Sequence, residues 1–161
     1  MRVRTSQSER PRRPLSCRLK RVLLHLVHGG GQLHPSRRHG YDIVAPLDED
    51  GRLNTDLWRS HWAYCRVIRF WGDSPSMAGM LRYRPAALEE EGWFLDFDPN
   101  SKDDDQFGYR LDIRKFMPGG YLSLHDRHDD VCKFQIVNVS ELPAQEAPAS
   151  RPEAAASGAA S

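Results

Sequence analysis

The sequence predicts an α+β domain, either a mainly antiparallel β-sheet or a small half-open barrel with one amphipathic helix, flanked by disordered termini. Three observations support this class. Short segments with alternating apolar residues recur between residues 66 and 139, one segment repeats its apolar residues at helical spacing, and the two ends lack core-forming residues. We therefore divide the chain into a basic N-terminal extension (1–38), an α+β domain (39–142) and an Ala/Pro/Ser-rich tail (143–161).

The extension is rich in arginine, and we expect it to be disordered apart from a short helix over residues 19–28 that ends at Gly29. A targeting peptide and an arm for nucleic acid or a membrane surface are alternatives. A further alternative is a start codon assigned too far upstream, so that the natural protein begins near His39.

Charge is distributed unevenly along the chain. The formal net charge is +1, but residues 1–38 carry +9, residues 39–142 carry −7 and the tail carries −1. An acidic domain repels phosphate backbones, so we expect nucleic acid to bind only through the extension. No apolar run approaches the ~20 residues of a membrane span, and we expect no membrane partner. The three cysteines are widely spaced, which favours a reducing cytoplasm.

The domain is expected to begin with a short strand through Ile43 and Val44, followed by a turn at Asp50 and Gly51. Asn54 or Thr55 is a suitable N-cap for the helix that follows. Its apolar face is predicted to contain five side chains at helical spacing: Leu57, Trp58, His61, Trp62 and Cys65.

Period-two segments after this helix predict strands over 66–71, 80–84, 93–98 and 109–116, and then a closing hairpin of 121–125 with 131–139. In the second pair we expect Tyr83 opposite Leu95 and Arg82 opposite Asp96. In the closing hairpin, the apolar faces are expected to place Leu124 opposite Cys132, Leu122 opposite Phe134 and His125 opposite Val131.

Signatures of nucleotide binding, zinc proteases and α/β-hydrolases are absent from the sequence. His61 and Cys65 are four residues apart on one helical face, but a cysteine beside tryptophans is usually an inert core residue. The acidic segment 98–108 contains oxygen ligands without the spacing of an EF-hand, and we interpret it as a solvated loop. The sequence favours a non-enzymatic protein, with no catalytic residue and no cofactor predicted.

Two histidines and three aspartates lie within the stretch "LHDRHDDV" (124–131). His125, Asp126, His128 and Asp130 are the candidate metal ligands, because imidazole and carboxylate groups are common ligands of divalent cations. The flanking strands favour a simpler interpretation, a five-residue hairpin tip whose aspartates suit a turn. Phe94 and Tyr121 are the candidate residues of a ligand or partner surface, since their strand neighbours are predicted to face inward.

Three stretches resemble those of a group of small bacterial proteins with no known activity. "HGYDIVAPLDEDGRLN" is similar to their opening HGYDxVAPLDxxGxxD, "CRVIRFW" follows it, and "FMPGGYLSLHDRHDDVCKFQIVNV" is similar to their ending FxPGxYVSIxxxDGxxHxFxVVxV. The resemblance covers His39 to Val139 and implies a self-contained domain without implying any functional residue. This chain departs from it at "HDRHDD", which stands where the others have an Asp-Gly turn.

These observations lead to three functional hypotheses. The favoured one is a small cytoplasmic domain that binds a protein partner or small ligand through its sheet. The second is a metal-binding protein or metal-dependent enzyme that uses the His125/His128 cluster, and the third is nucleic-acid association through residues 1–38.

Overall fold

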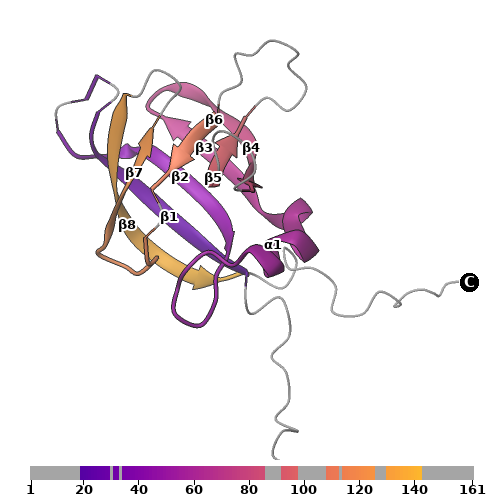
Figure 1. Cartoon of the computed structure of the whole chain (residues 1–161). Coiled ribbons are helices and arrows are strands. Elements are labelled where there is room, and N and C mark those ends of the chain that lie inside the picture. The colour runs from indigo at the N-terminus through magenta and orange to yellow at the C-terminus, as the bar shows by residue number, and fades with distance from the viewer. Residues whose placement is uncertain are drawn as a thin grey trace, which may run out of the picture.

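The computed structural model is a closed barrel of eight antiparallel strands in which each strand pairs with its sequence neighbours and β8 pairs with β1 (Figure 1). It describes residues 19–29, 31–32, 34–85, 92–97, 108–112, 114–125 and 130–142. The strands are β1 (Leu19–His28), β2 (Ser36–Pro46), β3 (Arg66–Trp71), β4 (Ser74–Arg84), β5 (Gly92–Asp96), β6 (Gly108–Leu111), β7 (Tyr121–His125) and β8 (Val131–Glu141). A helix α1 (Thr55–His61) and a 3₁₀ turn η3 (Trp62–Tyr64) connect β2 to β3.

The predicted helix over Leu19–His28 is wrong, because this segment forms β1 and pairs with both β2 and β8. Val22, Leu24 and Leu26 are buried on its inner face. Each such burial contributes roughly 1.5–3 kcal/mol, which exceeds the few tenths of a kcal/mol per residue that separate most intrinsic helix propensities.

Two parts of the barrel, β1 and the first residues of β2, thus precede His39, where the domain was expected to begin. A chain that began near His39 would lack β1 and the first residues of β2, and would leave the edges of β2 and β8 unpaired. Residues 1–18 and 143–161, to which the predicted disorder also applied, lie outside the described part of the chain.

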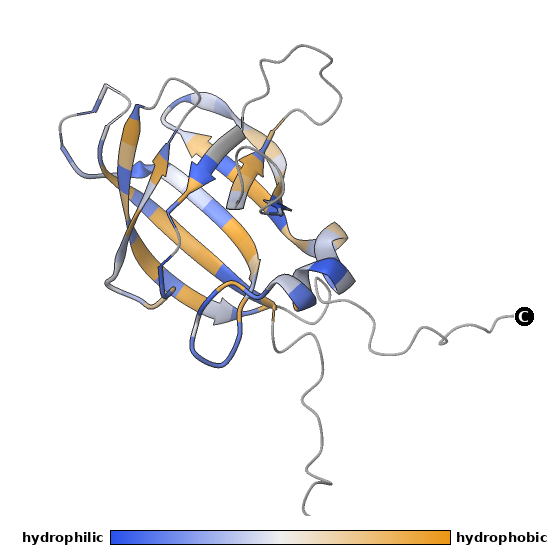
Figure 2. Ribbon diagram, in the orientation of Figure 1, coloured by the Kyte–Doolittle hydropathy of each residue, from blue (hydrophilic) through white to orange (hydrophobic). Residues whose placement is uncertain are grey.

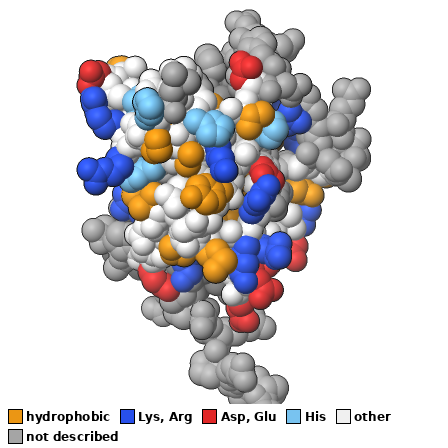
Figure 3. All heavy atoms as spheres, turned by 90° about the vertical axis from the view of Figure 1, so that its left-hand side faces the viewer, with side chains coloured by type: hydrophobic (Ala, Val, Ile, Leu, Met, Phe, Trp, Pro, Cys, Tyr) orange, Lys and Arg blue, Asp and Glu red, His pale blue; other side chains and the backbone are white. Residues whose placement is uncertain are grey.

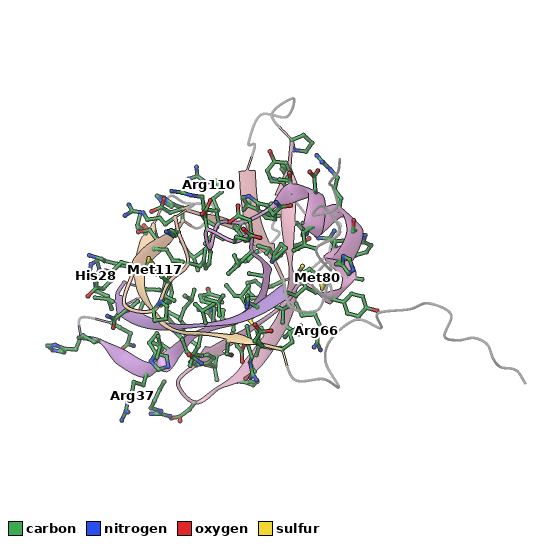
Figure 4. The ribbon with its side chains drawn as sticks, turned by 90° about the horizontal axis from the view of Figure 1, so that it is seen from below. His28, Arg37, Arg66, Met80, Arg110 and Met117 are labelled. Atoms are coloured by element: carbon green, nitrogen blue, oxygen red, sulfur yellow. The ribbon has the colours of Figure 1, made fainter. Side chains whose placement is uncertain are left out.

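Buried side chains from all eight strands form one hydrophobic cluster inside the barrel. Figure 2 shows that hydrophobic and hydrophilic residues alternate along several of these strands. An eight-stranded barrel has an interior about wide enough for side chains to fill. The largest fully buried side chains include Leu24, Leu26, Ile43, Leu81, Leu95, Leu122, Leu124, Phe134 and Ile136. The view along the barrel shows side chains directed into the ring of strands (Figure 4).

Helix α1 lies at one end of the barrel (Figure 1). Asn54 is its N-cap, as the sequence predicts, and accepts a hydrogen bond from the Leu57 backbone N–H at 2.8 Å. The Trp58 indole N–H donates to the Leu81 carbonyl at 2.8 Å, and its ring packs against Trp93 at 6.0 Å. The helix is shorter than its apolar pattern indicates. The α-helix ends at His61 and η3 follows, which leaves Trp62 46% exposed rather than buried.

The closing hairpin has the predicted register, with Leu122 opposite Phe134, Leu124 opposite Cys132 and His125 opposite Val131. The predicted register of β4 and β5 is wrong by two residues, because Tyr83 lies opposite Trp93 and Arg82 opposite Phe94. A shift of two keeps the same faces inside and outside, so the apolar pattern does not distinguish the two registers. Arg82 and Asp96 form an ion pair at 3.0 Å along the diagonal.

Burial of β1 can be tested with two neighbouring leucines. We predict that Leu24→Ala lowers the free energy of unfolding by about 2–5 kcal/mol, since it removes a fully buried side chain. Leu23→Ala, on the outer face of the same strand, is expected to cost less than about 1 kcal/mol. Urea denaturation measures both. Equally small effects would show that this segment does not contribute to the barrel core.

Candidate functional site

The barrel has a second end, opposite α1, where β1 ends and β2 begins (Figure 1). At this far end, four polar or aromatic side chains occupy inward-facing positions of β2 and β3. We call them the inner rim: His39, Tyr41, Arg69 and Trp71. The strand register places Tyr41 opposite Arg69 and His39 opposite Trp71. Their inward orientation follows from alternation with the buried residues Ile43 and Val67 on the same strands.

Tyr41 is the base of the inner rim. It is 2% exposed, and its ring packs against Phe134 at 5.2 Å and Phe97 at 6.1 Å. Phe134 belongs to β8 and Phe97 directly follows β5, so Tyr41 reaches across the barrel interior. A ligand at this end would therefore contact the inner rim and lie above the packed rings of Tyr41, Phe97 and Phe134.

Arg69 is the arginine of the inner rim, and two aromatic side chains hold it in place. Its Nε–H donates to the Tyr41 hydroxyl oxygen at 3.3 Å, and its guanidinium carbon lies 4.1 Å from the centre of the Trp71 ring. His39 packs edge-on against the same Trp71 at 4.7 Å. Such a cation–π contact contributes about 0.5–2 kcal/mol and holds the guanidinium in one plane.

The Arg69 guanidinium has N–H donors that can still bind a ligand. A guanidinium has five N–H donors, and only Nε–H has a hydrogen-bond partner among the residues that the structure describes. Within this same part of the chain, Arg69 also forms no ion pair with a carboxylate. A half-buried, oriented guanidinium is a good receptor for a carboxylate or phosphate group, which it can bind through two parallel hydrogen bonds.

Sequence reasoning did not identify this site. The signal was present in "RVIRFW", because Arg69 lies two residues from both Val67 and Trp71 and thus shares their face. An arginine at an inward position of a strand is unusual, since charged residues are seldom placed inside a core without a function or a partner.

Ser36 and His39 form a contact that resembles a nucleophile with its base. Ser36 Oγ lies 2.7 Å from His39 Nδ1, but the same oxygen also accepts a hydrogen bond from the Arg38 backbone N–H at 3.1 Å. Among the described residues, no carboxylate contacts the His39 ring to orient it, as a catalytic triad would require. We interpret the contact as one that fixes the start of β2.

The predicted metal site at the hairpin tip stays a prediction. His125 is half-buried at the end of β7 and Asp130 is exposed, whereas Asp126 and His128 lie outside the described residues. Across the described ranges, no three His, Cys, Asp or Glu side chains come close enough together to hold a metal ion. Histidines do gather on the upper part of the face shown in Figure 3, where hydrophobic side chains separate them.

The two predicted surface aromatics, Phe94 and Tyr121, lie on the outer faces of β5 and β7, with β6 between them. Each contacts its own cation. The Arg84 guanidinium lies 4.1 Å from the centre of the Phe94 ring, and Lys133 Nζ lies 4.7 Å from that of Tyr121. The structure thus gives two separate cation–aromatic pairs rather than one patch.

His61 and Cys65 do not form an activated thiolate pair. The Cys65 thiol contacts the His61 carbonyl oxygen at 3.5 Å instead of the imidazole ring, and the cysteine is fully buried. Burial raises the pKa of the Cys65 thiol to about 12, which disfavours the thiolate that nucleophilic chemistry needs. Cys65 is therefore a core residue.

Comparison with known proteins identifies no relative: no protein family, no curated protein and no solved structure matches this chain. In the described part of the chain, no helix has the length and apolar character to cross a membrane.

The assignment of Cys65 as a core residue can be tested through the reactivity of its thiol. At pH 8, a thiol with a pKa near 12 has roughly a thousandfold less thiolate than an exposed cysteine, so native Cys65 is expected to resist alkylation by iodoacetamide. Cys132 is only half-buried and is expected to react faster. Peptide mapping by mass spectrometry, with urea-unfolded protein as the reference, distinguishes the two. Rapid modification of Cys65 in the native protein would contradict its assignment as an inert core residue.

Proposed function

We propose that this protein is a non-enzymatic binding domain that takes up a small anionic ligand at the inner rim. The observation that carries the proposal is Arg69, a half-buried guanidinium at an inward position, held by Trp71 and Tyr41 and without a described carboxylate partner. Its remaining N–H donors match the geometry of a carboxylate or phosphate group.

The surroundings of Arg69 support binding rather than catalysis. The rim combines one oriented cation with aromatic rings, which is the usual composition of a recognition site with a few placed polar groups on apolar walls. Next to Arg69, the Ser36–His39 contact is the arrangement that most resembles a catalytic pair. Its serine oxygen already accepts a hydrogen bond from the Arg38 backbone N–H. The inner rim therefore has groups that attract an anion, and the described residues around it include no set of catalytic groups that would convert this anion into a product.

The interior below the rim limits the size of the ligand. Buried side chains form one cluster through the barrel, and Tyr41, Phe97 and Phe134 are packed beneath Arg69. We infer that the anionic group of the ligand pairs with Arg69 and that a flat or apolar portion contacts Trp71 and His39. A small aromatic or short-chain acid has this combination of groups.

Titration with inorganic phosphate and with benzoate tests the proposal, observed through the Arg69 Nε–H and tryptophan indole N–H signals in ¹H–¹⁵N NMR spectra. We predict saturable shifts of the Arg69 and Trp71 signals. Arg69→Gln is expected to weaken binding about tenfold or more, because a hydrogen bond to a charged group contributes about 1.5–3 kcal/mol. Tyr41→Phe keeps the ring and removes the oxygen that orients Arg69, and is expected to weaken binding a few-fold.

Arg38→Gln is the matched control. Arg38 also lies near the far end on β2, but it is exposed and forms an ion pair with Asp73. Its loss is expected to leave the affinity unchanged. Equal weakening by Arg38→Gln and Arg69→Gln would indicate general attraction of anions to the surface, and binding that survives Arg69→Gln would overturn the proposal. Thermal melting of each variant verifies the fold.

A further inference from the structure

His39 is the side chain of the inner rim that can change its charge near neutral pH. Its two ring nitrogens have different surroundings. Nδ1 lies 2.7 Å from the Ser36 hydroxyl oxygen, whereas Nε2 has no hydrogen-bond partner among the residues that the structure describes. A Cβ atom on Gly72 would lie 3.2 Å from Nε2, so any larger residue there would press against this nitrogen. The ring is partly exposed, and a proton can therefore reach it from solvent.

The contact with Ser36 is compatible with both charge states of the imidazole. A serine hydroxyl has one O–H donor and two lone pairs. The Arg38 backbone N–H, 3.1 Å away, donates to one lone pair of Ser36 Oγ. The hydroxyl can then donate to Nδ1 of a neutral ring, or accept Nδ1–H of a charged ring with its second lone pair. His39 can therefore gain a proton and keep the hydrogen bond that fixes the start of β2.

His39 lies close to the guanidinium of the proposed anion site. The Arg69 guanidinium carbon lies 4.1 Å from the centre of the Trp71 ring, and the centre of the His39 ring lies 4.7 Å from it. Two points at these distances from a common centre are at most about 9 Å apart, which is about the range of charge interactions at physiological ionic strength. A protonated His39 would thus add a second positive charge within reach of an anion bound at Arg69.

The other charged groups around His39 come from β2 itself, from β3 and the turn that follows it, and from β1. They are Arg37, Arg38, Arg69, Asp73, His25 and His28. The acid of this set, Asp73, is exposed and forms an ion pair with Arg38. Arg37 is exposed and points away from the barrel (Figure 4). His25 lies on the outer face of β1, where its ring meets Phe70. Within the described ranges, no carboxylate contacts the His39 ring, so none there offsets its charge.

We propose that the inner rim binds its anion in a pH-dependent manner, because protonation of His39 adds a second cation to the site formed by Arg69. This inference rests on the function proposed above and specifies how the same site is regulated. As the pH falls through the range in which histidine gains a proton, the affinity for the anion rises, and as the pH increases the added charge is lost and the affinity falls. The coupling is reciprocal, so binding of the anion must also favour the protonated ring and take up protons.

Titration with benzoate between about pH 5.5 and pH 8.5, the range in which histidine changes its charge, tests the proposal. Benzoate is a suitable probe because a carboxylic acid that titrates near pH 4 keeps a constant charge over this range, whereas phosphate changes its own charge near pH 6. The Trp71 indole N–H signal in ¹H–¹⁵N NMR spectra reports binding. The wild-type dissociation constant is expected to be about threefold to tenfold lower at the acidic end of the range, as a second charge at this distance in a partly exposed site implies.

His39→Asn removes the titrating group. The asparagine amide can still form a hydrogen bond with Ser36, but it gains no proton in this pH range. The variant is expected to bind benzoate a few-fold more weakly at the alkaline end, because the imidazole contact with the ligand is lost, and to show no further change on acidification. His28→Asn and His25→Asn are the matched controls, since His28 is exposed at the end of β1 and His25 lies on the outer face. Both are expected to keep the wild-type pH dependence.

Proton uptake by the wild-type protein is a second measurement that does not depend on the folding of any variant. Isothermal titration calorimetry near neutral pH, in two buffers with different ionisation enthalpies, measures the protons taken up when benzoate binds. A fraction of one proton is expected for the wild type and none for His39→Asn. Thermal melting of each variant verifies the fold.

Failure of this inference can be distinguished from failure of the proposed function. Arg69-dependent binding with the same affinity at every pH and without proton uptake would overturn the pH dependence and leave the proposed function in place. A pH dependence that persists in His39→Asn would also overturn it, because another group would then be responsible. Absence of benzoate binding at every pH, or binding that survives Arg69→Gln, would overturn both.

Discussion

The pairing of β1 with β8 is the constraint on which the rest of the structure depends. These strands come from opposite ends of the described chain, and Lys20 lies opposite Glu141 with an ion pair of 2.6 Å between their side chains. The ion pair is partly exposed and worth little by itself. The hydrogen-bonded ladder and the burial of Val22, Leu24 and Ile136 beside it are the main contributions, because closure removes both free edges of the sheet and encloses one core.

Closure also explains why neighbouring arginines of one strand lie on opposite faces of the barrel. A closed barrel has an inner and an outer face, and successive residues of each strand alternate between them. In β3, Arg69 and Trp71 face inward at the far end while Arg66 faces outward. In β4 and β5, Arg82 and Phe94 face outward while Leu81 and Leu95 enter the core. Arginine therefore occurs on both faces of the barrel wall, with Arg69 inside the rim and Arg66 and Arg82 on the outer face.

Close backbone packing determines where these side chains lie. A Cβ atom on Gly40 would lie 1.9 Å from the Leu24 carbonyl oxygen and 2.9 Å from the Phe70 ring, so β2 tolerates only glycine here. The space above Gly40 is shared by Phe70 and His25, whose rings meet edge-on at 6.3 Å. Burial and the nearby charge of Arg37 lower the pKa of His25, which favours its neutral ring. Gly40 thus lets β1, β2 and β3 pack closely just beside His39 and Tyr41.

The sequence by itself determined the local elements and the inward faces of most strands. Asn54 specifies the start of α1, and the alternation of Leu122 and Leu124 on β7 and of Phe134 and Ile136 on β8 determines which faces of the closing hairpin are buried. The tertiary structure decided what local patterns leave open. Leu19–His28 fits a helix or a strand and becomes β1 because β2 and β8 supply partners for its backbone. The facing of Arg69 and Arg82 follows from alternation with the buried Val67 and Leu81. Only the closed barrel brings Arg69 opposite Tyr41 and encloses both above Phe134, because these contacts depend on pairing between strands that are distant in sequence.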